Sequence, residues 1–460
     1  MLFISACFFT FASFAFGNSV DSFYPNLKNP EVISERTYNA LMYGNKYETR
    51  TDATDGSYSY CSMPHPSTNF YQEPQIIKNG SVSANLSSLL YIQRHQKRTM
   101  YHIFPQGETT KYDCHESRPY VYIGSANNSH PMPVPVFAKS YASNGNPLSD
   151  AFTNGSCQFP QLTIGGYLDG VQHGTELRKL YGEKYCVIPK DPNTKGVYLR
   201  SSTAPLTQDS AGGVLRGLWP NYHGSLPLHQ QISQIDTHEP SCDRKDALLK
   251  ASKETTLWKK HLNITQGLRK ELERMLLTNS SDWQSDWDHY NDNFQARLCN
   301  GYSLPCSTTS NDCVSEKQAN EVFTAGDWEY NYYWVTRENV TEAIKFTSGL
   351  FIKDLIELLK DMADSSKDLR YAHLFMHDGD LGPLAGSLGI QTLRWPGMGS
   401  NIAIELWKTD NDKHFVRALY SGWPIRSTLA DLDWIELDEF LKKWGQFIPN
   451  DYVDECAKGL

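Results

Sequence analysis

Two short apolar runs along the chain break abruptly into clusters of polar and charged residues. Residues 88–93 (SLLYIQ) continue directly into RHQKR, and residues 371–376 (YAHLFM) continue into HDGD. Apolar runs of this length are typical of buried strands. The carboxyl ends of neighbouring strands in an open α/β sheet meet in one crevice. The two strand ends can therefore build one polar site, although more than half of the chain lies between them.

Apolar residues at helical spacing predict helices in the outer parts of the chain, over 162–181, 210–218, 350–362 and 437–444. Residues 246–277 carry Lys, Glu and Leu at the same spacing and predict two further helices. Two apolar runs, 402–407 and 415–420, flank the polar segment TDNDK and predict a β-hairpin.

Strands and helices alternate in the first and last parts of the chain, whereas the middle is mainly helical. This order predicts an α/β fold with a mainly parallel sheet flanked by helices. We expect two separated halves of the chain, 85–218 and 336–460, to form the core, and an α-helical cap to be inserted at 219–335. Residues 18–84 show no sustained period and predict an irregular arm lying on the fold.

Composition indicates a folded protein that does not bind nucleic acid. Hydrophobic residues make up 40% and aromatic residues 12% of the chain, which is enough for a large core. The 43 Lys and Arg residues are outnumbered by 52 Asp and Glu residues, so the net charge is -9. A negative net charge disfavours contact with a phosphate backbone.

Residues 1–16 are strongly apolar and carry no charge. The run is shorter than the roughly 20 residues that span a membrane, and Ala15 and Gly17 suit a signal-peptidase cut before Asn18. We interpret residues 1–17 as a cleaved signal peptide. An uncleaved signal anchor is the alternative, and we expect membrane contact only in that case. Both interpretations place the bulk of the chain in the secretory pathway.

Sequons and cysteines support this location. The Asn-x-Ser/Thr sequons predict N-glycosylation at Asn79, Asn85, Asn127, Asn154, Asn263, Asn279 and Asn339. The cysteines after the leader form no CxxC pair and no metal-ligand spacing, which favours disulfides. Their number is odd, so one thiol should remain free, and the overall connectivity stays open. Cys299, Cys306 and Cys313 lie close enough together for two of them to close a local loop.

Arg94, His95 and Arg98 follow the first predicted strand directly. Guanidinium groups offer planar pairs of donors that match phosphate oxygens, although a solvated turn is the alternative interpretation. Arg200 ends a further strand-like segment and precedes a Ser/Thr-rich turn into a helix, which also suits an anion. An ordinary surface arginine is the alternative there.

His377 and Asp378 follow the second predicted strand, where a capped turn is the alternative interpretation. Together these residues predict phosphoryl transfer through a covalent intermediate. His95 would be the nucleophile, and Asp378 would protonate the leaving alcohol. The groups that bind the phosphoryl oxygens would be Arg94, Arg98, Arg200 and His377. We expect no metal and no cofactor because the arginines supply the positive charge, and we expect an acidic optimum because Asp378 acts when protonated.

The chain resembles the histidine acid phosphatases, branch 2 of the histidine phosphatases. Their RHGxRxP motif is similar to RHQKRTM at 94–100, and their HD motif with a following Leu is similar to HDGDL at 377–381. Two further family motifs are similar to LTIGGYLDGVQHGTELRKLY, which begins at Leu162, and RSSTAPLTQDSAGGVLRGLWP, which begins at Arg200. The resemblance extends from about residue 90 to the C-terminus. It implies the fold and the catalytic roles described above.

Two departures from the family pattern concern the phosphate pocket. Gln96 stands where the family has Gly, and Leu206 stands where a second Arg is common. We expect Gln96 to restrict access to the pocket and to affect specificity. Within the family, the resemblance is greatest to the Golgi-lumen enzymes that remove the 2-phosphate from xylose in the proteoglycan linkage region. It implies a phosphomonoester substrate on a phosphoxylosyl glycan. A general secreted acid phosphatase, a phytase-like enzyme and a non-catalytic phosphate- or glycan-binding module are the alternatives.

Overall fold

The structure is a computed structural model that describes residues 23, 24, 27, 58–105, 110–114, 119–120, 136–137, 139–143, 145–147, 155–192 and 195–458. The predicted signal peptide, the sequons at Asn127 and Asn154, and most of the predicted arm lie outside the described residues.

The core is a mixed β-sheet with the strand order β4-β5-β1-β6-β7-β8, and β9 pairs with β7. Its strands are β1 (Ala84–Arg94), β4 (Val197–Ser201), β5 (Tyr371–Met376), β6 (Asn401–Thr409), β7 (His414–Tyr420), β8 (Trp423–Pro424) and β9 (Ile435–Glu436). A separate small pair is formed by β2 (Pro119–Tyr120) and β3 (Val136–Phe137). The first two predicted strands are confirmed as β1 and β5, and the predicted hairpin is confirmed as β6 and β7.

The predicted α/β fold with flanking helices is confirmed, but its sheet is mixed and not mainly parallel. β4, β5 and β1 run parallel to one another, whereas the pairings that involve β6 and β7 are antiparallel. β6 runs antiparallel to β1, with Gln93 opposite Asn401. β6 is antiparallel to β1 because of the path that the chain takes between β5 and β6. The Gly399 amide donates to the His95 carbonyl, so the chain is already back at the carboxyl end of β1 when β6 begins. A strand that starts there can only run in the opposite direction.

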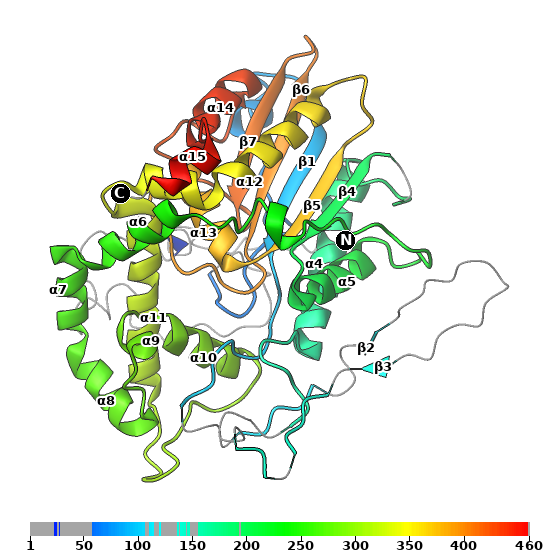
Figure 1. The fold of residues 1–460 in the computed structure, drawn as a ribbon. Helices are drawn as coiled ribbons and strands as arrows, with labels where there is room; N and C mark the ends of the chain where they lie inside the picture. Colours follow the sequence, from blue (N-terminus) through cyan, green and yellow to red (C-terminus); the bar gives the residue numbers. More distant parts are fainter. Residues whose placement is uncertain are drawn as a thin grey trace, which may run out of the picture.

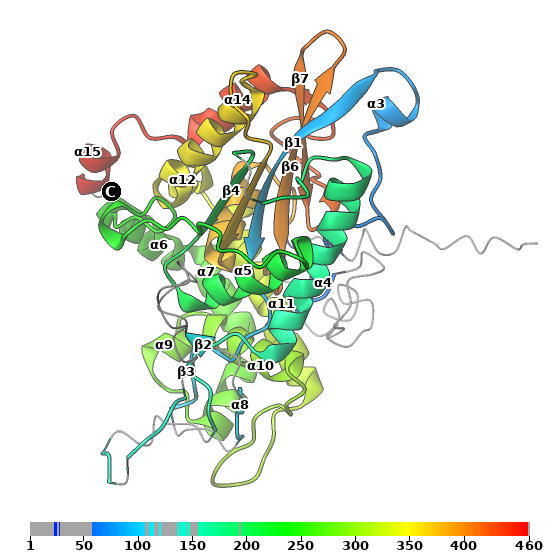
Figure 2. The same cartoon turned by 90° about the vertical axis from the view of Figure 1, so that its right-hand side faces the viewer.

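Helices cover both faces of the sheet (Figures 1 and 2). One face carries α4 (Ile164–Leu177) and α5 (Pro205–Leu218), and the other carries α12 (Val340–Ala363), α13 (Asp378–Ser387) and α14 (Leu437–Trp444). Side chains of β1 alternate between the two layers. Leu89 and Tyr91 pack in the cluster that contains α4 and α5, whereas Leu90 and Ile92 pack with α12 and α13. This alternation explains why β1 is apolar at consecutive positions.

The middle of the chain forms a helical layer below the carboxyl ends of β1 and β5 in Figure 1. Its helices are α6 (Asp243–Lys253), α7 (Thr256–Ile264), α8 (Gln266–Leu276), α9 (Ser281–Gln284), α10 (Asp288–Cys299) and α11 (Glu316–Asn331). Two short helices lie outside this layer, α3 (Gln75–Lys78) before β1 and α15 (Tyr452–Ala457) near the C-terminus.

The described part of the chain contains three disulfides between distant segments and one that closes a local loop. The pairs are Cys61–Cys299, Cys114–Cys157, Cys242–Cys456 and Cys306–Cys313. The prediction of disulfides is confirmed, and so is the local loop, which Cys306 and Cys313 close. Cys186 is the free cysteine within the described part of the chain, and it is exposed.

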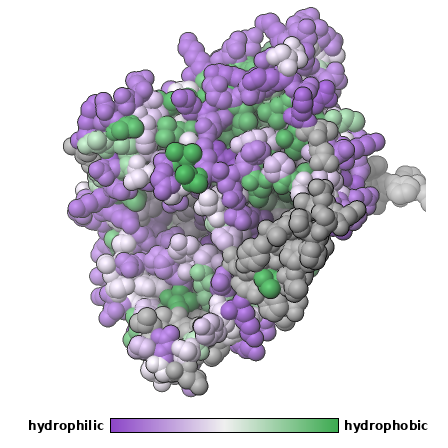
Figure 3. Space-filling model, turned by 45° about the vertical axis from the view of Figure 1, so that its right-hand side comes forward, coloured by the Kyte–Doolittle hydropathy of each residue, from purple (hydrophilic) through white to green (hydrophobic). Residues whose placement is uncertain are grey.

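The surface is compatible with the predicted location. Asn79, Asn85, Asn263, Asn279 and Asn339 are all exposed, so their glycosylation stays a prediction that the fold permits. On the face in Figure 3, hydrophobic residues occur in small groups between hydrophilic ones. Within the described ranges, no helix is both long enough and apolar enough to cross a membrane.

Candidate active site

Three parallel strands bring the predicted catalytic residues together. Arg94 and Met376 are register partners at the ends of β1 and β5, and the His95 amide donates to the Met376 carbonyl at 3.0 Å. The rings of His95 and His377 are consequently 5.6 Å apart. Ser202, which follows β4, places its Oγ 2.9 Å from His377 Nε2. The predicted meeting of His95 with His377 and Asp378 is therefore what the structure shows.

The hydrogen bonds of the His95 ring define its tautomer. Its Nδ1 lies 2.9 Å from the Gln96 carbonyl oxygen, which can only accept, so Nδ1 carries the proton and Nε2 keeps its lone pair. Arg98 Nε donates towards Nε2 at 3.4 Å. Burial lowers the pKa of His95 well below its usual value, and the charges of Arg94 and Arg98 lower it further. The ring is therefore neutral at the acidic pH expected for the reaction.

Asp378 is the first residue of α13 and is held by two donors. Arg94 Nη2 lies 2.9 Å from Oδ2, and Trp395 Nε1 donates to the same oxygen at 2.9 Å. Burial tends to raise the pKa of Asp378, but the charges of Arg94 and Arg98 outweigh it, so the pKa lies below its usual value. Burial lowers the pKa of the neighbouring His377 to about 4. The two arginines therefore favour the ionised form of Asp378, and His377 is neutral at pH 5.

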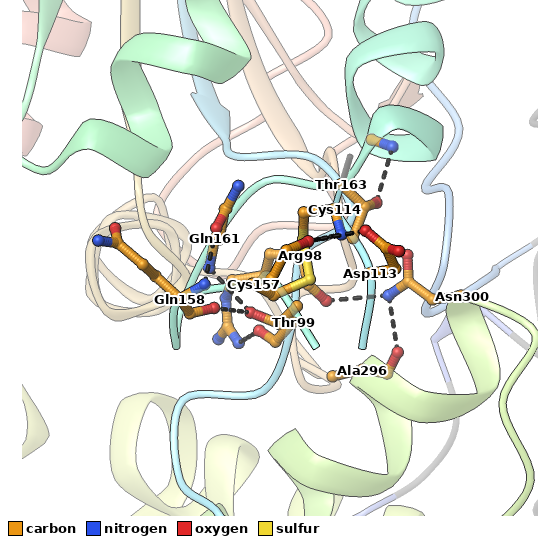
Figure 4. The surroundings of a disulfide bond; sticks show 12 residues. Arg98, Thr99, Asp113, Cys114, Cys157, Gln158, Gln161, Thr163, Ala296 and Asn300 are labelled. Carbon is orange, nitrogen blue, oxygen red and sulfur yellow. Dashed lines mark hydrogen bonds between the residues drawn. A yellow bond between two sulfur atoms is a disulfide. The ribbon is translucent and has the colours of Figure 1, made fainter. Parts of the chain in front are cut away.

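The segment that follows His95 is fixed by its surroundings (Figure 4). The Thr99 hydroxyl donates to the Gln158 carbonyl at 2.8 Å and accepts from the Gln161 amide at 2.9 Å. Asn300 donates to the Arg98 carbonyl at 3.0 Å. Gln158 follows the Cys114–Cys157 disulfide directly. These contacts fix the backbone of Arg98, and Asp292 holds its guanidinium through an ion pair of 2.8 Å.

A cavity of about 920 Å³ opens at the ends of the three strands. It is lined by His95, Arg98, Tyr101, Ser140, Gln158, Phe159, Pro160, Ala204, Pro205, Leu206, His238, Glu239, Lys245, Thr347, His377, Asp378, Gly379 and Asp380. Four of the predicted site residues are therefore at the cavity wall. Arg94 lies behind the wall, where it pairs with Asp378 and donates to the Pro396 carbonyl.

Arg200 is not part of this cavity wall, which corrects its predicted role as a phosphate ligand. Its guanidinium binds Asp354 at 2.8 Å and Thr237 at 2.8 Å, and it also donates to Gln231. The physical reason is its position within β4. A side chain inside a strand points to one face of the sheet, whereas the site is built by residues beyond the strand ends. Leu206, at the start of α5, lines the cavity instead.

Gln96 also differs from its prediction, because its side chain is buried and is not part of the cavity wall. Gln96 Nε2 lies 3.3 Å from His173 Nδ1, on the side of the sheet that α4 covers. A Cβ on Gly399 would be 2.6 Å from Gln96 Oε1, so this glycine makes room for the longer side chain. The expectation that Gln96 restricts access to the pocket was therefore wrong.

His238 and Lys245 also line the cavity, although no sequence pattern predicted them. His238 Nδ1 bonds Asp236 Oδ1, and its ring lies 6.4 Å from the His377 ring. Lys245 belongs to α6 and donates to the Pro240 carbonyl at 3.0 Å. The only local signal was the spacing of Asp236 and His238. Nothing in that spacing indicates proximity to β1 or β5.

Several known proteins are similar to this chain. Counting factor 60 of Dictyostelium discoideum is 23% identical over 416 residues, which cover 86% of this chain and 92% of that protein. The 2-phosphoxylose phosphatase 1 of Xenopus tropicalis is 21% identical over 437 residues, covering 87% of this chain and 82% of the relative. Among solved structures, a Hafnia alvei phytase in complex with tartrate is similar in fold, with a TM-score of 0.53 and 12% identity. The alignment covers 80% of this chain and 98% of the phytase.

The family itself is shown by a match to the whole catalytic region. The model of the histidine phosphatase superfamily (branch 2) matches residues 87–421, which include His95, His377 and Asp378. The resemblance inferred from the motifs is thus confirmed, and the chain belongs to branch 2 of the histidine phosphatase superfamily, as an enzyme of the histidine acid phosphatase type.

Proposed function

We propose that the protein hydrolyses phosphomonoesters through a phosphohistidine intermediate on His95. The observation that carries this proposal is the hydrogen bond from His95 Nδ1 to the Gln96 carbonyl, because it places the proton on Nδ1 and the lone pair on Nε2, which lies beside Arg98 Nε at the cavity wall. Nε2 attacks phosphorus, the bond from phosphorus to the ester oxygen breaks, and Asp378 gives its proton to that oxygen. Water then attacks the phosphohistidine and gives a proton to Asp378, which releases phosphate and restores His95.

Hydrogen-bond donors for the phosphoryl oxygens come from several side chains around His95. Arg98, His377, His238 and Lys245 line the cavity, and Arg94 lies behind Asp378. We infer that His238 and Lys245 supply donors on the side where Leu206 replaces the family arginine. These donors stabilise the charge that the phosphoryl group carries in the transition state. The mechanism uses no metal.

The substrate we propose is a glycan that carries one phosphate, such as phosphorylated xylose of the glycosaminoglycan linkage region. Relatives named 2-phosphoxylose phosphatase support this class. The cavity wall supports a single phosphate, because Arg98 and Lys245 face three carboxyl groups there, those of Glu239, Asp378 and Asp380. A substrate with several phosphates would meet too few cations for its charge. We further propose that the enzyme acts in the lumen of the secretory pathway, as the disulfides and exposed sequons suggest.

The first experiment compares the wild-type protein with His95→Ala on a small aryl phosphate at about pH 5, in the presence of a chelator. We expect turnover by the wild type and none by the variant, whereas His102→Ala, a half-exposed histidine outside the cavity wall, should retain turnover. Turnover by His95→Ala would contradict the proposed nucleophile. The absence of turnover in all three proteins would favour a phosphate-binding module.

A second experiment separates the substrate classes. Equal concentrations of a 2-phosphoxyloside and inositol hexakisphosphate are offered to the wild-type enzyme, and phosphate release from each is measured. We expect the phosphoxyloside to be hydrolysed faster. Faster hydrolysis of inositol hexakisphosphate would favour the phytase-like alternative, and equal rates would favour a general acid phosphatase.

A further inference from the structure

A second cavity, of about 510 Å³, adjoins the catalytic cavity. The two cavities share Lys245 and Thr347 in their walls. The rest of the wall of the second cavity consists mainly of aromatic, acidic and basic side chains. We call it the aromatic cavity, because it is walled by Tyr330, Tyr333, Trp334 and Trp395.

The aromatic cavity lies on the side of the leaving group. Trp395 belongs to its wall, and the indole Nε1 of this residue donates to Asp378 Oδ2 at 2.9 Å. In the proposed mechanism Asp378 protonates the leaving oxygen, so the rest of the alcohol must begin beside Asp378. A leaving group larger than one ring therefore extends towards Trp395 and enters this cavity.

The wall of the aromatic cavity combines the faces of aromatic rings with hydrogen-bond donors and acceptors. Asp282, Asp286 and Asp288 offer carboxylate oxygens, and Lys253 pairs with Asp286 at 2.6 Å. Arg337 is 7% exposed, and its Nε and Nη1 atoms have no hydrogen-bond partner among the described residues. Its guanidinium carbon lies 5.8 Å from the centroid of Tyr333 and 5.5 Å from that of Trp334. Donors and acceptors thus stand beside flat apolar surfaces.

We propose that the aromatic cavity is a leaving-group subsite that binds a second carbohydrate ring of the substrate; this inference rests on the proposed function. A sugar ring has C–H faces that pack on aromatic rings and hydroxyl groups that both donate and accept. It therefore satisfies the carboxylates, Arg337 and the ring faces together. An alkyl chain would leave the charged groups desolvated and without partners. A cationic leaving group would meet the charge of Arg337, which already lies against the rings of Tyr333 and Trp334.

The test compares three phosphomonoesters: a small aryl phosphate, a xyloside 2-phosphate, and the same phosphoxylose extended by one further sugar. The wild-type enzyme should show a higher kcat/KM for the disaccharide than for the xyloside. In Tyr333→Leu the ratio between these two values should fall about three- to tenfold, the range expected when an aromatic contact is lost. Tyr222→Leu, another half-buried tyrosine in a different cavity, should leave the ratio unchanged.

Direct binding keeps the inference separate from the proposed function. The unphosphorylated disaccharide should bind the wild-type protein in calorimetry, and Tyr333→Leu should weaken this binding by a similar factor. Two results would overturn the subsite. One is an equal ratio of kcat/KM for the disaccharide and the xyloside in the wild type and in Tyr333→Leu. The other is a higher kcat/KM for phosphocholine, assayed as a fourth ester, than for the phosphorylated disaccharide. A wild-type enzyme that binds the disaccharide but fails on all three esters would contradict the proposed catalysis and support the subsite.

Discussion

Asp378 and Asp380 lie two positions apart on the first turn of α13, and both line the catalytic cavity. Their environments differ. Asp378 bonds Arg94 and Trp395, whereas Asp380 Oδ2 caps the helix by accepting the His377 amide at 3.0 Å. Burial raises the pKa of Asp380 to about 6. Both carboxyl groups lie where a proton donor is needed. We assign the proton transfer to Asp378 because it pairs with Arg94, the last residue of β1, which directly precedes His95.

We expect Asp378→Asn to lower kcat by about 10²–10⁴-fold, the usual contribution of general acid catalysis. Asp380→Asn removes a carboxyl group from the same cavity, and its amide oxygen can still accept the His377 amide, so its kcat should stay within about tenfold of the wild type. Steady-state kinetics on a small aryl phosphate measures both values. A larger decrease in kcat for Asp380→Asn than for Asp378→Asn would identify Asp380 as the proton donor.

The pH dependence of kcat/KM follows from the pKa shifts of the free enzyme. His95 must be neutral, and its lowered pKa satisfies this at acidic pH. Asp378 must be protonated, and its lowered pKa makes that form rarer as pH rises. Activity should therefore be highest at acidic pH and fall on the alkaline side. In Trp395→Phe the ionised Asp378 loses a hydrogen bond, so its pKa rises and the alkaline limb should move to higher pH.

A profile measured from acidic to alkaline pH on both proteins checks this. A flat profile would contradict the assigned roles of His95 and Asp378. A limb that moves to lower pH in Trp395→Phe would contradict the contact between Trp395 and Asp378.

Among the elements, α11 holds the loop that carries Trp395. Asp327 binds Arg394 Nε at 2.7 Å and accepts the Trp395 amide at 3.0 Å, and both charged side chains are buried. Arg394 also donates to the Tyr60 hydroxyl at 2.9 Å, which ties the segment before β1 to the same loop. A buried ion pair thus connects α11 with the loop that carries Trp395.

We expect Asp327→Ala to lower the free energy of unfolding by about 3–5 kcal/mol, because it leaves the charge of Arg394 buried without its carboxylate. Asp312→Ala removes a carboxylate from an exposed pair with Arg274 and should change stability little. Denaturant unfolding of both variants measures the difference. Equal stability of the two variants would contradict a structural role for the buried pair.

The strands differ in how far their local sequence predicts them. β1 and β5 were predictable because each ends abruptly in polar residues, and this located His95, His377 and Asp378. Arg200 was assigned to the site because the sequence places it near a strand end. In the structure β4 continues to Ser201, so Arg200 lies inside the strand and its side chain points to one face of the sheet. The direction of β6 and the cavity position of His238 depend on how the chain returns through space, which no local pattern records.

At the scale of the whole molecule, disulfides join distant parts of the chain. Cys242 at the start of α6 pairs with Cys456 in α15, at a sequence separation of 214. Cys306 and Cys313 are only 7 positions apart. A cross-link stabilises mainly by restricting the unfolded chain, and the effect grows with the length of the loop it closes. The oxidising lumen in which we propose that the enzyme acts would preserve both bonds.

Replacing Cys242 and Cys456 together by Ala should lower the free energy of unfolding by about 2–5 kcal/mol. The double replacement of Cys306 and Cys313 should cost less because its loop is short. Denaturant unfolding under non-reducing conditions compares the two variants. A larger decrease in the free energy of unfolding for the Cys306 and Cys313 replacement than for the Cys242 and Cys456 replacement would contradict the expected dependence on loop length.

The central claim is that the phosphoryl group is transferred from the substrate to His95. Trapping the phosphohistidine intermediate tests this claim most directly. The enzyme is mixed rapidly with a small phosphomonoester and denatured in alkali, in which phosphohistidine is stable, and the peptide that contains residue 95 is analysed by mass spectrometry. We predict one phosphoryl group on His95 in the wild type and in His102→Ala, and none in His95→Ala. Turnover by the wild type without any phosphoryl group on His95 would contradict the account.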